Sequence, residues 1–171
     1  MGKLVLGIGN VLLRDEGIGC HVAHALESQP VGTLPDVKII DGGTCPDMLQ
    51  LLEGAGKLVI VDAVKGGGPP GQIYRFQLGD ITLEKKPFLS LHDVTLVDSL
   101  MSMQLWYADK IGIDETVIIG VEPKEINWGL ELSAELQEKM PQIVNIVLSE
   151  LNTPPNLSLQ VEKSGEGVKE R

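Results

Sequence analysis

Four side chains that could do chemistry stand at the ends or starts of predicted elements: Glu16, Asp41, Asp62 and His92. His92 begins a predicted helix, and because a helix N-terminus disfavours imidazolium, its ring should stay neutral and able to bind a metal. With Glu16 and Asp62 it would supply two oxygen ligands and one nitrogen ligand, leaving positions open for substrate and water. Such an open site can polarise a carbonyl group or lower the pKa of bound water.

The same residue types also have structural interpretations. Glu16, together with its neighbour Asp15, could simply favour the N-terminus of a helix, and Asp62 could cap a turn. The spacing alone therefore leaves both a metal site and a structural role open. His21 and His24 are interpreted as surface histidines, because they fall opposite the apolar stripe of the first predicted helix.

Short apolar runs bounded by glycine predict the strands that would position these residues. The runs are residues 3–8, 37–40, 58–64 and 116–121, with helical segments between them. Continuous apolar strands separated by helices are typical of a parallel sheet covered on both faces, whereas residues 72–78 alternate as an edge strand does. The predicted fold is therefore α/β, a three-layer α/β/α sandwich around a mainly parallel, twisted sheet with one antiparallel edge strand. Ligands of such sheets bind at the carboxyl ends of the strands.

Apolar residues at spacings of three and four predict three helices. They cover about residues 18–26, 92–107 and 132–151. Pro141 lies within the third pattern, so a kink or two successive helices are expected there. Residues 152–171 contain few large apolar side chains and are predicted to form a disordered tail, which leaves residues 1–151 as a single domain.

The composition excludes several classes of protein. The chain has 171 residues, 43% of them hydrophobic and 22% charged, which is typical of a globular protein. Its formal net charge of −10 disfavours nucleic acid and anionic membranes as partners. The first apolar stretch is too short for a secretory signal, and no apolar run is long enough for a membrane helix. We expect a cytoplasmic monomer.

The glycines after the first apolar run do not complete a nucleotide-binding motif. Gly7 and Gly9 would need a third glycine at position 12, where the chain has Leu12. A tight exit from the strand is the favoured interpretation of these glycines. A nucleotide-binding α/β enzyme stays an alternative.

Other catalytic motifs are missing from the sequence. It has no His-Glu-x-x-His helix and no Gly-x-Ser-x-Gly elbow, and neither Cys20 nor Cys45 has an obvious base partner. A resident zinc ion and a serine or cysteine nucleophile are therefore not expected. Trp128 is interpreted as a packing residue, with a position facing a partner as the alternative.

Five segments, in order, resemble the nickel–iron hydrogenase maturation endopeptidases. They are residues 7–19, 41–44, 59–63, 89–93 and 120–124, and the resemblance extends from residue 3 to about residue 150. The resemblance implies a protease that trims a short C-terminal extension from a hydrogenase large-subunit precursor after nickel insertion. It places the metal-contacting positions at Glu16, Asp62 and His92, with Asp41 as a nearby supporting acid. Where the family often has glycine after its second motif, this chain has Cys45-Pro46.

The nickel implied by this resemblance belongs to the substrate. A weak, open site of three ligands would engage only a precursor that already holds the metal, so differential binding would act as a checkpoint. One alternative is a non-catalytic nickel carrier, which would bind nickel tightly by itself and cut nothing. The nucleotide-binding enzyme is the other.

Overall fold

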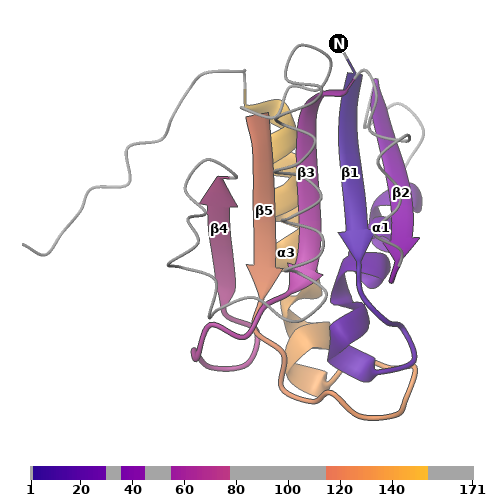
Figure 1. Ribbon diagram of the computed structural model, residues 1–171, viewed down its shortest axis with the longest axis vertical. Coiled ribbons are helices and arrows are strands. Elements are labelled where there is room, and N and C mark those ends of the chain that lie inside the picture. Colours follow the sequence, from indigo (N-terminus) through magenta and orange to yellow (C-terminus); the bar gives the residue numbers. More distant parts are fainter. Residues whose placement is uncertain (1, 30–35, 45–54, 78–114, 154–171) are drawn as a thin grey trace, which may run out of the picture.

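The computed structural model describes residues 2–29, 36–44, 55–77 and 115–153. They form β1 (Gly2–Ile8), the 3-10 helix η1 (Arg14–Gly17), α1 (Ile18–Glu27), β2 (Val37–Gly43), β3 (Ala55–Ala63), β4 (Ile73–Gln77), β5 (Thr116–Val121) and α3 (Ala134–Asn152) (Figure 1). The helix predicted over residues 92–107, with His92, lies outside these ranges, as do Cys45-Pro46 and the predicted tail from residue 154 onward. No helix within the described ranges is long and apolar enough to cross a membrane.

The five strands form one mixed sheet in the order β2-β1-β3-β5-β4. β1 pairs in parallel with β2 and β3, β3 pairs in parallel with β5, and β4 is antiparallel to β5 at the edge. This arrangement confirms the predicted α/β class with a mainly parallel sheet and one antiparallel edge strand. From β1 the chain adds β2 on one side and β3 on the other, so the sheet has a topological switch point between β1 and β3. Crevices at such points are where open α/β sheets bind ligands.

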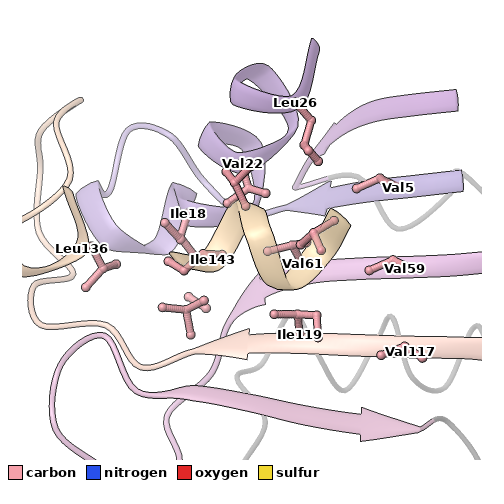
Figure 2. Close-up of a cluster of buried hydrophobic side chains, with 14 of the residues drawn as sticks. Val5, Ile18, Val22, Leu26, Val59, Val61, Val117, Ile119, Leu136 and Ile143 are labelled. Atoms are coloured by element: carbon pink, nitrogen blue, oxygen red, sulfur yellow. The ribbon is translucent and has the colours of Figure 1, made fainter. Parts of the chain in front are cut away.

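The core lies between one face of the sheet and the two described helices (Figure 2). Alternate strand residues such as Val5, Val61 and Ile119 face α1 and α3, because side chains alternate between the two faces of a strand. The residues between them, such as Leu6 and Ile60, point to the other face and are also buried. Burial on both faces explains why these strands read as continuous apolar runs.

α3 is one continuous helix with Pro141 inside it, so the expectation of two successive helices is wrong. The proline lacks the N–H that would bond to the carbonyl of Gln137, which costs the helix one hydrogen bond. Leu136 and Ile143, on either side of that point, are both completely buried in the same core. Burial of this continuous apolar face therefore outweighs the lost bond.

The first turn of α1 packs directly against the ends of β1 and β3. A Cβ atom on Gly19 would overlap the carbonyl oxygens of Ile8 and Val61, and one on Gly7 would overlap the carbonyl oxygen of Gly19. Glycine is therefore required on both sides of this contact. Of the two glycines predicted to form a tight strand exit, Gly9 lies at the exit with a φ of +140°, whereas Gly7 lies inside β1 and permits the approach of the helix backbone.

Candidate active site

Three of the four predicted site residues come to one edge of the sheet. We call it the carboxyl edge, the edge at which β1, β2, β3 and β5 end; it is the lower end in Figure 1. Asp41 lies near the end of β2, Asp62 is the penultimate residue of β3, and Glu16 lies on η1, which follows β1. His92, the fourth predicted residue, is outside the described ranges.

Glu16 is positioned through its backbone. Gly9 has a φ of +140°, and a Cβ atom there would overlap the carbonyl oxygen of Glu16, so η1 lies directly on the exit from β1. The amide of Glu16 donates to the carbonyl of Leu13 at 3.3 Å. η1 also contacts β3, the strand that carries Asp62. Glu16 and Asp62 therefore stand on contacting elements at the switch point of the sheet.

Asp62 is a buried carboxylate at the end of a buried strand. Its Oδ1 atom accepts a hydrogen bond from the amide of Ala63 at 2.8 Å. Its neighbour Val61 belongs to the core under α1. Because successive side chains alternate, Asp62 points to the face of the sheet away from α1.

The side chain of Asp41 lies on the opposite face of the sheet from that of Asp62, the face that α1 covers. Gly7 pairs with both Asp41 and Val61, so the side chains at these positions lie on the α1 side of the sheet. There the Oδ2 atom of Asp41 is 2.8 Å from Nε2 of His24, and its Oδ1 atom accepts from the amide of Gly43 at 3.0 Å. The structure therefore brings Asp41 to the predicted edge but separates its side chain from that of Asp62.

Asp41 is held in its ionised form. Partial burial raises the pKa of this carboxyl, but the nearby Cys20 thiol, the hydrogen bond from the Gly43 amide and His24 outweigh the burial and leave the pKa below its usual value. An ionised carboxylate can only accept hydrogen bonds, so Nε2 of His24 carries the proton in this contact. Burial is the main cause that raises the pKa of Cys20 to about 12, and the nearby Asp41 carboxylate adds to it. The thiol donates a hydrogen bond to the carbonyl of Gly9 at 3.4 Å. The Cys20 thiol therefore stays protonated and is a poor nucleophile.

Asp15 has a structural role rather than the helix-terminal one considered from the sequence. It is completely buried and accepts four hydrogen bonds from the segment 122–133, which we call the 122–133 loop. The donors are the amides of Lys124 and Glu125, each at 2.9 Å, and the amide and hydroxyl of Ser133, at 2.7 and 2.8 Å. Asp15 therefore holds η1, and with it Glu16, against the 122–133 loop, which follows more than a hundred residues later in the chain.

The two histidines of α1 differ. His24 is exposed, as predicted, but its contact with Asp41 was missed. His21 is only partly exposed, its Nε2 atom is buried, and the ring lies against the backbone of Leu130. Burial, together with nearby His24, lowers the pKa of His21. The surface interpretation therefore fails for His21.

Glu122 is a further buried acid at this edge, to which the sequence assigned no role. Its Oε2 atom accepts from the amide of Gly66 at 2.7 Å and from the hydroxyl of Tyr74 at 2.8 Å. The same hydroxyl accepts from the amide of Gly68 at 3.0 Å. Burial, followed by the bond to Glu122, raises the pKa of Tyr74. Glu122 therefore holds the glycine-rich loop that leaves β3 just beyond Asp62.

Within the described ranges, no group of three His, Cys, Asp or Glu side chains is arranged to hold a metal ion. The predicted trio includes His92, so it extends beyond these ranges. The described part supplies two carboxylates, Glu16 and Asp62, on contacting elements. Their roles toward a metal remain a prediction.

The fold and this edge define the general class: an α/β protein with an open, mainly parallel sheet and acids at its switch point. Residues 20–150 match the model of the hydrogenase maturation protease family. The chain is 30% identical over 156 residues to the hydrogenase 2 maturation protease of Escherichia coli, a match that covers 88% of this chain and 91% of that protein.

Solved structures agree with the sequence match. The hydrogenase-maturating endopeptidase HybD from E. coli superposes with a TM-score of 0.72 and 27% identity, over 88% of this chain and 92% of that one. The nickel–iron hydrogenase maturation protease HybD from Thermococcus kodakarensis gives a TM-score of 0.71 and 26% identity, over 87% and 98%. The chain therefore belongs to the hydrogenase maturation protease family. It is an endopeptidase, as the resemblance in its sequence implied.

Proposed function

We propose that this endopeptidase removes the C-terminal extension of a nickel–iron hydrogenase large-subunit precursor after nickel has been inserted. The similar protein from T. kodakarensis bears the name of a nickel–iron hydrogenase maturation protease, which supports this class of substrate. The observation that carries the proposal is the position of Glu16 and Asp62 on contacting elements, η1 and β3, at the carboxyl edge. This edge is where a mainly parallel sheet receives its ligand.

In this proposal nickel arrives with the substrate. Glu16 and Asp62 would offer oxygen ligands and His92 a nitrogen ligand, a set that suits a divalent transition metal. Each contact would be present only when the precursor carries nickel, so the loaded precursor binds more tightly than the empty one. Specificity is then the difference between these two affinities.

Peptide hydrolysis would proceed by attack of water with help from carboxylates, in the manner of an aspartic peptidase. The protonated state of Cys20, whose pKa is raised to about 12, speaks against a thiolate nucleophile at that position. Asp41 stays the predicted supporting acid in this proposal. Because its side chain pairs with His24 on the opposite face of the sheet from Asp62, it would act through its negative charge rather than by contact with the reacting bond. The sequence-based prediction of a cytoplasmic monomer completes the proposal.

The test is the intact mass of the large-subunit precursor, nickel-loaded and nickel-free, before and after incubation with this protein. We expect loss of a C-terminal peptide from the loaded form alone. Loss from both forms would contradict the nickel checkpoint. Loss from neither form, with loading of the precursor verified, would contradict the proteolytic role toward this substrate and favour a nickel carrier.

Variants of the predicted ligands test the site itself. Glu16→Gln and Asp62→Asn keep the shape of each side chain and remove its charge, and His92→Ala removes the predicted nitrogen ligand. Each should slow processing of the loaded precursor by at least about 100-fold. Asn145→Ala, a substitution of an exposed residue on α3, is the matched control and should process normally. Normal processing by His92→Ala would disprove the assignment of that residue.

A further inference from the structure

A group of large apolar side chains is exposed beside η1. Trp128 is 80% exposed, Leu130 65%, Leu12 48% and Ile126 39%. Within the described ranges, all the large hydrophobic residues with exposed side chains belong to this group. We call these four residues the apolar loop surface. A concentration of exposed apolar side chains in one region typically marks an interaction site.

The four side chains come from two segments that are joined by backbone hydrogen bonds. Leu13 and Gly129 form a β-bridge. The amide of Gly129 donates to the carbonyl of Leu12 at 3.0 Å, and the amide of Arg14 donates to the carbonyl of Gly129 at 2.9 Å. Leu12 and Trp128 therefore lie on adjoining segments, where the indigo segment after β1 meets the orange loop after β5 (Figure 1).

The apolar loop surface is held in one conformation. The four hydrogen bonds to Asp15 fix the 122–133 loop from beneath. Gly129 has a φ of +155°, and a Cβ atom there would stand 2.8 Å from Nε of Arg14, so only glycine fits. A rigid surface loses little conformational entropy when it binds a partner.

Two ion pairs lie next to the apolar loop surface, and Glu131, beside Leu130, is an exposed acid outside them. Arg14 Nη1 lies 3.6 Å from Glu125 Oε2, and Lys124 forms an ion pair with Glu135. This balance contrasts with the net charge of −10 of the whole chain. The complementary partner is therefore a neutral, apolar protein surface rather than a strongly charged one.

The surface adjoins the element that carries Glu16, because Leu13, which bridges to Gly129, directly precedes η1. A folded protein that brings a peptide bond to this edge would place part of its body near this neighbouring loop. We propose that Leu12, Ile126, Trp128 and Leu130 form the docking site for the folded body of the large-subunit precursor, with Trp128 as its anchor. This inference rests on the proposed function. Tryptophan is the side chain most typical of interface hot spots.

The binding test uses Trp128→Ser and Leu130→Ser, each in the Glu16→Gln background so that cleavage does not consume the complex. The Kd for the nickel-loaded, full-length precursor is measured against Glu16→Gln alone. We expect Trp128→Ser to weaken binding by roughly 30-fold, as for a hot-spot residue, and Leu130→Ser to weaken it less. Asn145→Ala in the same background is the control and should bind unchanged. Because Trp128 is exposed, the melting temperature should change by less than about 2 °C.

The kinetic test uses the active enzyme. Trp128→Ser should raise KM for the precursor and leave kcat unchanged, which is the signature of binding lost equally from ground state and transition state. An unchanged Kd and KM, with the unsubstituted enzyme cleaving normally, would overturn the docking site while leaving the proposed function intact. Failure of the unsubstituted enzyme to cleave would instead contradict the proposed function, and the Kd measurement would still decide the docking site.

A second copy of the chain is the competing occupant of this surface. Native mass spectrometry of the unsubstituted protein and of Trp128→Ser distinguishes the two. A dimer that dissociates on substitution, with an unchanged Kd for the precursor, would overturn the proposal. A monomer in both cases, with weakened precursor binding, would support it.

Discussion

The two ends of the sheet hold their buried charges in different ways. At the amino edge, where the parallel strands begin, Lys57 donates to the carbonyl of Thr153 at 3.2 Å, beyond the end of α3. Near it, Arg75 pairs with the buried Glu150, with Nη2 and Oε2 3.1 Å apart. At the carboxyl edge the buried acids Asp15 and Glu122 are instead held by backbone amides and by serine or tyrosine hydroxyls.

This difference indicates that the buried charges of the amino edge stabilise the fold, whereas those of the carboxyl edge can also act on a ligand. An ion pair cancels the field of both partners, whereas amide and hydroxyl dipoles stabilise a carboxylate and leave its net charge in place. Asp15 and Glu122, which are held by amides and hydroxyls, therefore contribute a negative potential at the carboxyl edge, whereas Asp41 is paired there with His24. This potential would favour the nickel-loaded precursor that we propose as the substrate.

The largest expected effect is on the stability of the carboxyl edge. Asp15→Ala would leave three backbone amides and the Ser133 hydroxyl without their buried acceptor. We expect the free energy of unfolding to fall by about 3–5 kcal/mol, measured by urea denaturation. Glu16→Gln, one residue further on, is the contrast: it should change stability by less than about 1 kcal/mol while abolishing processing. Equal loss of stability in both variants would contradict the division of roles between these neighbours.

A smaller effect is expected at the amino edge. Arg75→Met removes the cation that faces the buried carboxylate of Glu150. Unfolding free energy should fall by about 1–3 kcal/mol, less than for a fully buried pair because the Arg75 side chain is 34% exposed. Processing of the loaded precursor, followed by intact mass, should stay normal.

The double variant Arg75→Met, Glu150→Gln is the control for that measurement. Because it removes the charge that Arg75 neutralises, it should recover part of the lost stability. A processing defect in Arg75→Met, at a temperature where the variant remains folded, would show that the amino edge also serves the reaction.

The smallest effect concerns pH. The pKa of Asp41 in the folded protein lies below its usual value, so ionised Asp41 stabilises the fold above the unfolded pKa, about 3.9. This stabilisation is lost as the pH falls through the folded pKa. Asp41→Asn should therefore lower the free energy of unfolding at pH 6 by less than about 1 kcal/mol, because the side chain is 37% exposed.

Urea denaturation at pH 6 and at pH 3 measures the change. The difference between the unsubstituted protein and Asp41→Asn should shrink toward zero at the lower pH. A difference that stayed constant would show that Asp41 stabilises the fold through packing rather than through its charge.

Much of the sheet could be predicted from the sequence because apolar runs report burial directly. The run 116–121 corresponds to β5 at both ends, and the alternating segment 72–78 is the antiparallel edge strand β4. β2 extends three residues beyond its predicted end, through Asp41 to Gly43, because strand pairing involves the backbone and tolerates polar side chains. The edge occupied by Glu16, Asp41 and Asp62 was predicted correctly for the same reason, since strand ends fix it.

The partners of these acids could not be predicted, because they are set by contacts distant in sequence. Asp15 meets Lys124 and Ser133, which are 109 and 118 positions further along the chain. The link between Cys20 and Asp41 depends on how α1 lies against β2, which hydrophobic spacing does not specify. Sequence patterns record which residues are buried, whereas the choice of hydrogen-bond partner arises only after the elements pack.

The hydrogen bonds to Asp15 also bear on when the active site can form during synthesis of the chain. During synthesis the segment with Glu16 emerges early, but the donors that hold its neighbour, up to Ser133, emerge more than a hundred residues later. Closing so long a loop is slow compared with local helix formation. A nascent chain therefore contains Glu16 before the 122–133 loop that holds η1 in place has been made. We therefore expect proteolytic activity to begin only when nearly the whole domain has been translated.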